Sequence, residues 1–343
     1  MAQQTSHPND PPSAREPRTV DADVLIVGAG PAGLFGAYYA GFRGFSVAVV
    51  DSLPELGGQV SALYPEKAIL DVAGFPTVKG RELVEQLVEQ ASSANPTYLL
   101  GRTATGLTID AGAEGGVTME LDDGSVVNAK VVIITAGIGK FTPRALPAGN
   151  GWEGRGLVFF VPSFAEYAGR DVVIVGGGDS AFDWAHSLHP IAASVTLVHR
   201  RDQFRAHQAT VDAVLASEVE VVTKAQVTSL LGDGVIEKVE ITTNSGDVLV
   251  RPAQAVVAAL GFIADLGAMK DWGLDLDKRH IMVDPAMRTN LPRVFAAGDI
   301  TEYDGKVRLI AVGFGEVATA VNNAAVVIDP AAHVFPGHSS EGS

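Results

Sequence analysis

Short apolar runs recur along the chain, and glycine-rich turns or helical stretches separate them. Runs of this length predict the buried strands of a parallel sheet, and they lie at residues 24–27, 47–50, 131–135, 171–175, 195–198 and 255–260. Further strands are expected at residues 219–222, 235–242 and 248–250. Helical spacing of Leu83, Leu87 and Val88 predicts an amphipathic helix over residues 80–94, and residues 117–129 predict a hairpin that turns at Asp123-Gly124. The pattern is typical of an α/β fold.

The first glycine motif lies in residues 23–51, DVLIVGAGPAGLFGAYYAGFRGFSVAVVD. The order strand, turn, helix, strand predicts a dinucleotide-binding unit. Gly28 permits the tight turn, Gly30 lets the backbone approach a pyrophosphate, and Gly33 lets the helix pack closely on the strand. Asp51 ends the second strand, where a carboxylate can accept the hydroxyls of an adenosine ribose. Pro31 and Ala32 complete the predicted pyrophosphate turn at the helix N-terminus.

The same pattern returns with an offset of 148 residues (171 − 23), as a strand at residues 171–175 and a helix at 180–189. Gly176, Gly178 and Ala181 give the spacing GxGxxA. The position equivalent to Asp51 is His199 (51 + 148). Three arginines, Arg200, Arg201 and Arg205, follow it. Arginines bind a 2′-phosphate through charge-assisted hydrogen bonds, whereas a carboxylate repels it. We therefore predict a dinucleotide with a free ribose in the first copy and NADPH in the second.

Two stretches predict where the chain passes between these units. Residues 137–156 are rich in glycine and proline, with a crossing near residues 139–143, and a second crossing is expected at residues 284–292. A strand at residues 293–299 ends in Gly298-Asp299, and a helix at 316–327 follows it. We predict a first domain of residues 21–140 and 290–343 with a second domain, residues 141–289, inserted into it. Residues 1–20, with several prolines among polar residues, predict a disordered tail.

Composition narrows the function. Lys and Arg total 25 against 40 Asp and Glu, a formal net charge of −15, which argues against nucleic acid or an anionic membrane as the main partner. The N-terminus lacks the apolar core of a signal peptide, and no apolar run reaches the roughly 18 residues that a membrane-spanning helix needs. We therefore expect a cytoplasmic protein with no membrane partner. The chain has no cysteine, which excludes disulfide and thiolate chemistry, and its eight histidines show no metal-ligand spacing.

Several stretches together carry a family resemblance: LGGQVSALYPEK, DVAGFP, GGGDSAFDWA, HRRDQFRAH, LIAVGFGEVATAVNNA and PGHSS. They resemble ferredoxin–NADP⁺ reductases of the thioredoxin-reductase-like type. The resemblance implies two Rossmann-like domains, FAD and NADP(H) as cofactors, ferredoxin as the electron partner and a homodimer. Thioredoxin reductases carry Cys-x-x-Cys shortly before the second glycine motif, whereas this chain has GLVFFVP at residues 156–162. Without cysteines, electrons have no dithiol route to a protein disulfide.

The resemblance also implies particular contacts. Tyr64 and His338 would cover opposite faces of the flavin ring, and a helix beginning near Gly315 would point its positive end at the flavin. The FAD-binding residues would be Gly28, Gly30, Pro31, Ala32, Gly33, Asp51, Gly58, Gln59, Tyr64, Ala104, Phe141, Asp299 and Ser340. The NADPH-binding residues would be Gly176, Gly178, Asp179, Ser180, His199, Arg200, Arg201 and Arg205. The loop with Gly57-Gly58 and Pro65 is expected to be irregular and to run beside the cofactor.

Two alternatives remain open at this point. One is a general NADPH-dependent flavoprotein oxidoreductase that serves quinones, flavodoxin or another acceptor. The other is a non-enzymatic nucleotide sensor built from the paired folds. For the ferredoxin reductase, an acidic chain needs a local basic patch to dock an acidic ferredoxin, and Lys306 with Arg308 is a candidate.

Overall fold

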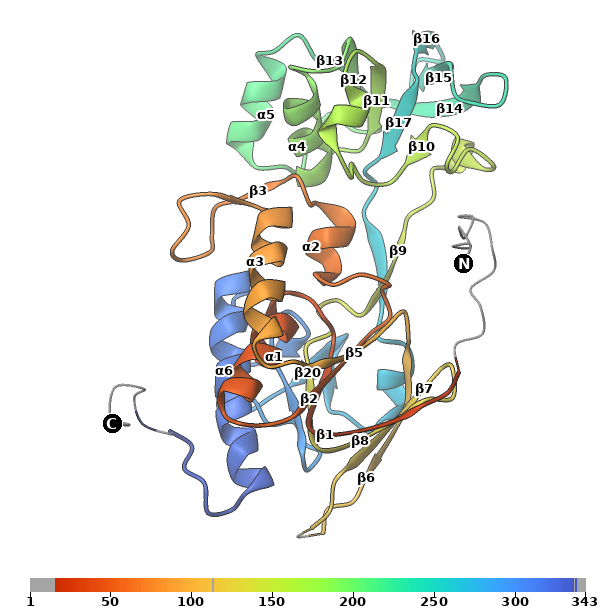
Figure 1. Ribbon diagram of the computed structural model, residues 1–343. Helices are drawn as coiled ribbons and strands as arrows, with labels where there is room; N and C mark the ends of the chain where they lie inside the picture. Colours follow the sequence, from red (N-terminus) through yellow and green to blue (C-terminus); the bar gives the residue numbers. More distant parts are fainter. Residues whose placement is uncertain (1–15, 113, 336, 338–343) are drawn as a thin grey trace, which may run out of the picture. The chain divides into compact units, whose positions relative to one another are not determined.

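The computed structural model describes residues 16–112, 114–335 and 337 (Figure 1). Contacts divide the chain into two compact units: the first unit is Met1–Ser61, Ile69–Lys140 and Asp265–Ser343, and the second unit is Ala62–Ala68 and Phe141–Ala264. The sequence placed the return to the first unit at residue 290, whereas the structure returns at Asp265. Leu266, Met269 and Ile281 explain this difference, because their side chains are buried in the core of the first unit.

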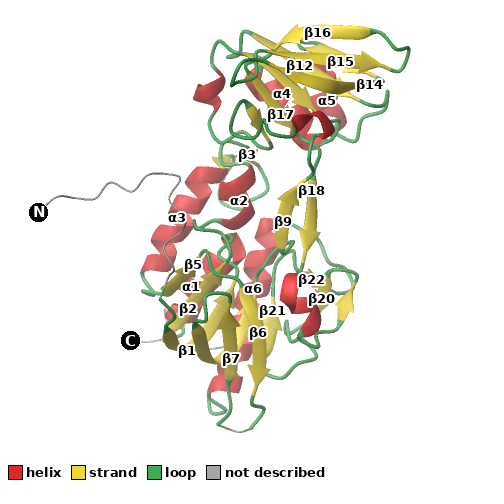
Figure 2. Ribbon diagram, turned by 90° about the vertical axis from the view of Figure 1, so that its right-hand side faces the viewer, coloured by secondary structure: helices red, strands yellow, loops and turns green. Residues whose placement is uncertain are grey.

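The first unit is built on a seven-stranded sheet with strand order β5-β2-β1-β8-β7-β6, and β21 also pairs with β8. Figure 2 shows these strands in yellow. The first two central strands pair in parallel with Val24 opposite Val47. The strands are β1 (Thr19–Val27), β2 (Val47–Asp51), β5 (Thr97–Leu100), β6 (Ala104–Ile109), β7 (Val117–Leu121), β8 (Val126–Ile134) and β21 (Val294–Ala296). Thr19 and Val20 thus belong to β1 rather than to the predicted tail, whose residues 1–15 lie outside the described residues.

Three helices of the first unit pack together beside this sheet: α1 (Pro31–Phe42), α3 (Gly80–Ser92) and α6 (Ile310–Ile328). The buried face of α6 includes Val317, Val321 and Ala324. Among the described helices, α6 alone is long and apolar enough to span a bilayer, contrary to the expectation that no apolar run reaches this length. Its packing against α1 and β8 is that of a core helix. It also begins at Ile310, before the predicted start.

Smaller elements complete the first unit. They are α2 (Gly58–Leu63), which continues into the second unit, β3 (Ala68–Ile69), β4 (Val78–Lys79), η3 (Gly267–Asp271), β19 (Leu276–Asp277), β20 (His280–Met282) and β22 (Thr301–Glu302). The short strands β19, β20 and β22 form a separate sheet. The prediction of an irregular loop after β2 was wrong at α2, a helix of six residues that begins at Gly58, the second glycine of the pair.

The second unit has a parallel sheet of order β10-β17-β11-β12-β13 and a second, antiparallel sheet of β14, β15 and β16. Buried side chains of α4 and α5 pack on one face of the parallel sheet, and the antiparallel sheet covers the other. The elements are β10 (Leu157–Val158), η2 (Phe164–Tyr167), β11 (Asp171–Val175), α4 (Asp179–Leu188), β12 (Ser194–His199), α5 (Gln208–Leu215), β13 (Glu220–Thr223), β14 (Ala225–Leu231), β15 (Lys238–Thr243), β16 (Val248–Pro252) and β17 (Ala255–Ala258).

The chain enters the second unit through β9 (Lys140–Pro143), which precedes η1 (Pro147–Gly149), and leaves through β18 (Phe262–Asp265). β9 and β18 pair with each other. The boundary between the two units, after Lys140, falls within residues 139–143, where the sequence places the crossing. The hairpin at Asp123-Gly124 is also confirmed, although β8 runs without a break from Val126 to Ile134, where the sequence suggested two strands.

Candidate functional site

Of the three glycines in the first glycine turn, Gly28 and Gly33 are tightly packed and Gly30 faces open space. Gly28 has φ +113°, and a Cβ there would lie 2.5 Å from the carbonyl oxygen of Thr135. A Cβ on Gly33 would lie 1.8 Å from the carbonyl oxygen of Gly28, so the helix packs directly on the turn. A Cβ on Gly30 would meet no described atom within 4 Å. Gly30 caps α1, and no side-chain hydrogen bond caps this helix end. The half-buried, uncapped helix N-terminus can therefore receive a pyrophosphate.

Asp51 closes the same turn from the end of β2. One carboxylate oxygen accepts the N–H of Ala29 at 2.6 Å, and the other accepts the N–H of Leu53 at 2.8 Å. Burial raises the pKa of the Asp51 carboxyl, although the N–H groups of Leu53 and Ala29 act in the opposite direction. Each oxygen keeps acceptor capacity beyond its one N–H. Asp51 is therefore placed to fix the turn and still accept hydroxyl groups of a ribose.

The segment after β2 lies against this turn. The N–H of Gly57 donates to the carbonyl oxygen of Ala29 at 2.9 Å. A Cβ on Gly58 would lie 2.9 Å from the Cα of Gly30, so a larger residue would not fit. Gln59 lies beside Gly137, because a Cβ there would be 2.6 Å from the Gln59 amide nitrogen. The structure thus brings Gly58 and Gln59 to the glycine turn as predicted positions for FAD contacts.

Ala104 lies near the same end of the sheet, because the residues just before it are bonded to the end of β2. It is the first residue of β6, and Arg102, two residues earlier, donates its N–H to the carbonyl oxygen of Asp51 at 3.0 Å. The Ala104 side chain is half-buried against the core of the first unit. This hydrogen bond between the segment after β5 and the end of β2 was not visible in the sequence.

Gly298 and Asp299 form a turn after β21 that meets both α1 and α6. A Cβ on Gly313 of α6 would lie 3.4 Å from the Cα of Gly298 and 3.6 Å from the Cβ of Ala32. Asp299 is half-buried. Burial is the largest effect and raises the pKa of the Asp299 carboxyl. The charges of Lys306 and Arg308 act to lower this pKa, and the charge of Glu316 acts to raise it. The first turns of two helices and the Gly-Asp turn therefore converge in the first unit.

Lys306 has a role that the sequence did not reveal. Its side chain is 1% exposed and pairs with Glu316, which is 5% exposed, at 2.5 Å. Arg308 pairs instead with the surface residue Glu302 at 2.6 Å. The suggestion that Lys306 and Arg308 form a ferredoxin-docking patch was therefore wrong for Lys306, whose ammonium group is not available at the surface.

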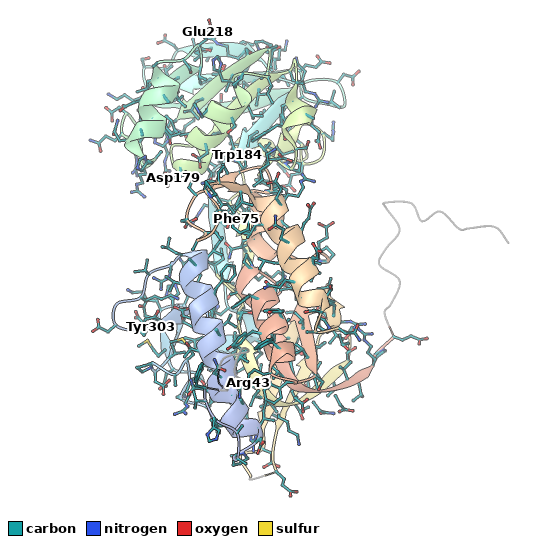
Figure 3. All side chains as sticks on the ribbon, turned by 60° about the vertical axis from the view of Figure 1, so that its left-hand side comes forward. Arg43, Phe75, Asp179, Trp184, Glu218 and Tyr303 are labelled. Carbon is teal, nitrogen blue, oxygen red and sulfur yellow. The ribbon has the colours of Figure 1, made fainter. Side chains whose placement is uncertain are left out.

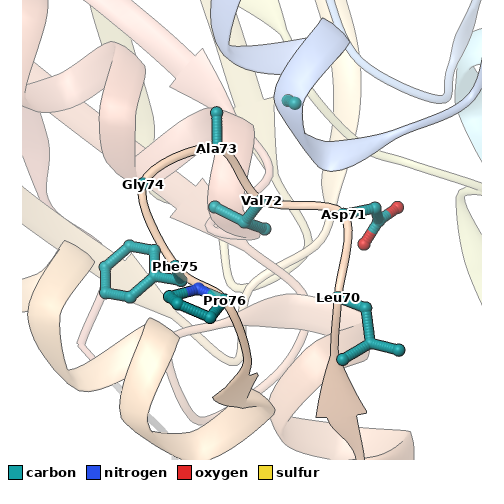
Figure 4. Close-up of a pocket in the computed structure, with 8 residues that line it drawn as sticks. Leu70, Asp71, Val72, Ala73, Gly74, Phe75 and Pro76 are labelled. Atoms are coloured by element: carbon teal, nitrogen blue, oxygen red, sulfur yellow. The ribbon is translucent and has the colours of Figure 1, made fainter.

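A hollow of about 560 Å³ lies next to the start of α6 (Figure 4). Ala311 contributes from the first turn of α6, two residues before Gly313. The other lining residues come from the DVAGFP segment and its neighbour, residues 70–76. Figure 4 shows this segment as a loop that curves around the opening. The hollow is in the first unit, beside the convergence of α1, α6 and the Gly-Asp turn.

The second glycine turn repeats the first with other side chains. A Cβ on Gly176 would lie 2.5 Å from the carbonyl oxygen of Ala259, whereas a Cβ on Gly178 would meet no described atom within 4 Å. The ring of His199 lies over Gly177, where a Cβ would be 2.3 Å from it. Burial lowers the pKa of His199, and the charges of Arg200 and Arg201 lower it further. A hydrogen bond to the backbone of Gln203 raises this pKa, but the net shift is downward and favours the neutral imidazole in the unliganded turn.

The three arginines are exposed, and their guanidinium groups have no ion-pair or hydrogen-bond partner among the described residues. Only backbone atoms are engaged: the N–H of Arg205 donates to the carbonyl oxygen of Gly177 at 2.7 Å. Asp179, the first residue of α4, accepts the N–H of His207 at 2.8 Å, and Ser180 is exposed beside it. Unpaired guanidinium groups at the end of β12 suit a phosphate group.

Four predicted flavin contacts are not among the described residues of the first unit. Tyr64 belongs to the second unit and packs against its core. Phe141 also belongs to the second unit, where its ring meets Phe262 edge-to-face at 5.6 Å. His338 and Ser340 lie outside the described residues. The site assignments for all four stay predictions.

The residues present fit two dinucleotides. Each unit has an uncapped helix N-terminus with space above its second glycine, and the groups beyond the two strands differ in charge. Among the described residues there is no group of three histidine or acidic side chains that could hold a metal ion.

The sequence matches the pyridine nucleotide-disulphide oxidoreductase family over residues 22–324. A ferredoxin–NADP reductase of a Nocardioides species is 73% identical over 325 residues, covering 94% of this chain and 98% of that protein. Another from Frankia alni is 65% identical, covering 92% and 98%. The chain therefore belongs to the pyridine nucleotide-disulphide oxidoreductases and, within them, to the ferredoxin–NADP reductases. This family uses FAD and NADP(H), and the predicted fold of two Rossmann-like domains, one inserted into the other, is confirmed.

The solved structures add a contrast. The thioredoxin reductase of T. acidophilum is 29% identical, with a TM-score of 0.73 and coverage of 89% of this chain and 97% of that one. The Lactococcus lactis enzyme is 25% identical, with a TM-score of 0.72 and coverage of 90% and 99%. Since this chain has no cysteine in its 343 residues, it shares their fold without a dithiol of its own.

Proposed function

We propose that this chain is an FAD-dependent ferredoxin–NADP⁺ reductase, with FAD in the first unit and NADP(H) in the second. The observation that carries the proposal is the pair of equivalent glycine turns with opposite charge beyond them: Asp51 in one, and the unpaired Arg200 and Arg201 in the other. A carboxylate selects a free ribose, and guanidinium groups select a 2′-phosphate.

The side chains bind and orient, because the cofactors carry the electrons. When bound, FAD converts the two-electron chemistry of a nicotinamide into single-electron transfers. Gly30, Asp51 and Asp299 would hold the FAD through its pyrophosphate, ribose and ribityl groups. Gly178 and the arginines would hold NADPH, with the ring of His199 beside them over Gly177. No side-chain acid or base is needed for the hydride step.

Ferredoxin as the partner follows from the names of the relatives. Of the two cations suggested for docking, Lys306 is buried and Arg308 pairs with Glu302 at the surface. We also propose a homodimer, as the family resemblance implies, and sedimentation of the purified chain tests it. A row of aromatic side chains on α1 that continues to Phe314 of α6 supports this, because Phe42 at its end is 56% exposed. A cytoplasmic location stays a prediction.

The test is an anaerobic stopped-flow experiment on the FAD-loaded protein. NADPH should bleach the flavin absorbance faster than NADH does, and added ferredoxin should then be reduced in repeated turnovers. Thioredoxin should remain oxidised, because the chain has no cysteine. Bleaching without ferredoxin reduction, but with reduction of a quinone or flavodoxin, would favour the general oxidoreductase. A chain that binds NADPH without bleaching would be a sensor.

A further inference from the structure

The ion pair of Lys306 and Glu316 is the most deeply buried pair of opposite charges in the described part of the chain. The two side chains are 1% and 5% exposed, and the other described pairs have partners that are more accessible to solvent. Desolvation of two charges cancels much of their attraction, so a buried pair is weak support for stability by itself. Its presence calls for another role.

Both charged groups bind the backbone of one residue, Gly298. Glu316 accepts the N–H of Gly298 with one oxygen at 2.7 Å. Its other oxygen accepts the ammonium of Lys306 at 2.5 Å, and the same ammonium donates to the carbonyl oxygen of Gly298 at 3.0 Å. Thr301 donates its hydroxyl to this carbonyl at 2.8 Å. The peptide groups on both sides of Gly298 are therefore held by one pair of charges.

Holding both peptide groups of Gly298 fixes the direction of Asp299, the next residue. Gly298 has φ +81°, a left-handed conformation. Fixing the peptide group before and after it fixes both of its torsions, and with them the direction in which Asp299 leaves the backbone. Tyr303 secures the arrangement, because its hydroxyl donates to Glu316 at 2.6 Å. Figure 3 shows Tyr303 on the segment that lies beside α6.

We propose that Lys306 and Glu316 are positioning residues that hold the Gly298-Asp299 turn ready for FAD before the cofactor arrives. The proposal rests on the proposed function, in which Asp299 binds the ribityl chain. Preorganisation of this kind raises affinity by removing the entropy loss of ordering the turn during binding. The pair also sets the charge around Asp299, because Lys306 and Glu316 are both among the charges that face its carboxyl.

Three variants separate positioning from stability. Lys306→Met leaves the Glu316 carboxylate buried without its cation, and Glu316→Gln leaves the ammonium without its anion, so each single variant should lower the melting temperature of the apoprotein. The double variant Lys306→Met plus Glu316→Gln removes both charges and should recover the melting temperature. FAD affinity should not recover, because neither neutral side chain can hold the two peptide groups of Gly298 together.

The readout is the dissociation constant of FAD, measured by fluorescence titration of the apoprotein, together with the visible spectrum of the bound flavin. We expect the double variant to bind FAD about tenfold more weakly, or about 1.4 kcal/mol. Glu302→Gln, the same chemical change in the surface pair with Arg308, is the control and should bind FAD like the wild type. Failure of the wild type to bind FAD would reject the proposed function. A double variant with wild-type affinity and spectrum would reject the positioning role alone.

Discussion

The two glycine turns, with the strands on either side of them, repeat the same backbone arrangement in the first and second units but carry different side chains. Val24 pairs with Val47 in the first unit and Val172 with Val195 in the second, 148 residues later in both strands. The N–H of Gly28 donates to the carbonyl oxygen of Val50, and that of Gly176 to Val198, again with the same offset. The backbone frame is therefore conserved within the chain down to its register.

The difference lies in how the turn is closed. In the first unit Asp51 accepts the N–H of Ala29. At the equivalent position in the second unit, the larger ring of His199 lies over Gly177, where even a Cβ would not fit. The turn is held instead by the N–H of Arg205, which donates to the carbonyl oxygen of Gly177. Because a backbone N–H holds this turn, the side chains of residues 200 and 201 are not needed to close it and remain exposed. The backbone arrangement of the two turns is therefore the same, while the group that would contact the ribose differs.

The third glycine position gives the largest expected effect. Gly33→Ala would place a Cβ 1.8 Å from a backbone oxygen, which cannot move away as a flexible side chain can. We expect destabilisation of the first unit by about 3 kcal/mol or more. The equivalent residue in the second unit is Ala181, which is buried, and Ala181→Gly should cost about 1–2 kcal/mol through the helix propensity of glycine and the loss of one methyl group.

Hydrogen exchange measured separately in each unit checks this prediction, because a two-unit chain need not unfold in one step. Protection should fall in β1, β2 and α1 of Gly33→Ala, while the second unit keeps its protection. Equal protection in the variant and the wild type would show that the α1 turn adjusts freely.

The arginines give the next largest effect. Arg200→Ala plus Arg201→Ala should lower kcat/KM for NADPH by about tenfold to a hundredfold for each lost phosphate contact, equivalent to about 1.5–3 kcal/mol. The value for NADH should not change, because NADH has no 2′-phosphate. Steady-state kinetics with both nucleotides measure the ratio.

Arg170→Ala is the matched control, since Arg170 is also exposed and in the second unit but lies before β11. It should keep the preference for NADPH. A double variant that keeps the wild-type preference would contradict the assignment of NADP(H) to the second unit.

The sequence predicted those parts of the fold whose pattern is complete within a short stretch of residues. Residues 23–51 contain a complete strand, turn, helix and strand, and the second copy could be recognised from the first. The Lys306–Glu316 pair could not be predicted in this way. The expected helix began at Glu316, whereas α6 begins at Ile310, and that earlier start places Glu316 inside the helix with a buried side chain. Lys306 therefore appeared to be a surface cation.

The return to the first unit was misplaced for a related reason. Residues 265–289 contain short strands and a 3₁₀ turn without a long apolar run. Ile281 in β20 is buried because β20 pairs with β22, and its neighbour in space is Thr301. That pairing joins residues twenty apart in sequence, so local periodicity does not reveal it. Contacts of this kind depend on tertiary packing, which overrides local preference.

The smallest expected effect concerns pH, and here the two units should respond in opposite directions. Burial raises the pKa of Asp51 and lowers the pKa of His199, so both groups are less readily charged than usual. For His199 the unfolded chain, with a pKa of about 6.5, takes up the proton first as the pH falls. Its contribution to stability is therefore present above about pH 6.5 and is lost as the pH falls through the folded pKa.

For Asp51 the sign is reversed. The folded state takes up the proton first, so the contribution of Asp51 to stability rises as the pH falls through its raised pKa toward the unfolded value of about 3.9.

The His199 effect can be measured by hydrogen exchange of the apoprotein between pH 7.5 and 5.5. Protection at the end of β12 should fall as the pH falls, and His199→Asn should remove that slope. NADP⁺ should weaken the slope in the wild type, because a phosphate with a charge of about −1.5 to −2 favours the imidazolium. NAD⁺, which lacks this phosphate, should not. The same slope in wild type and His199→Asn, with either nucleotide, would mean that His199 does not titrate in this turn.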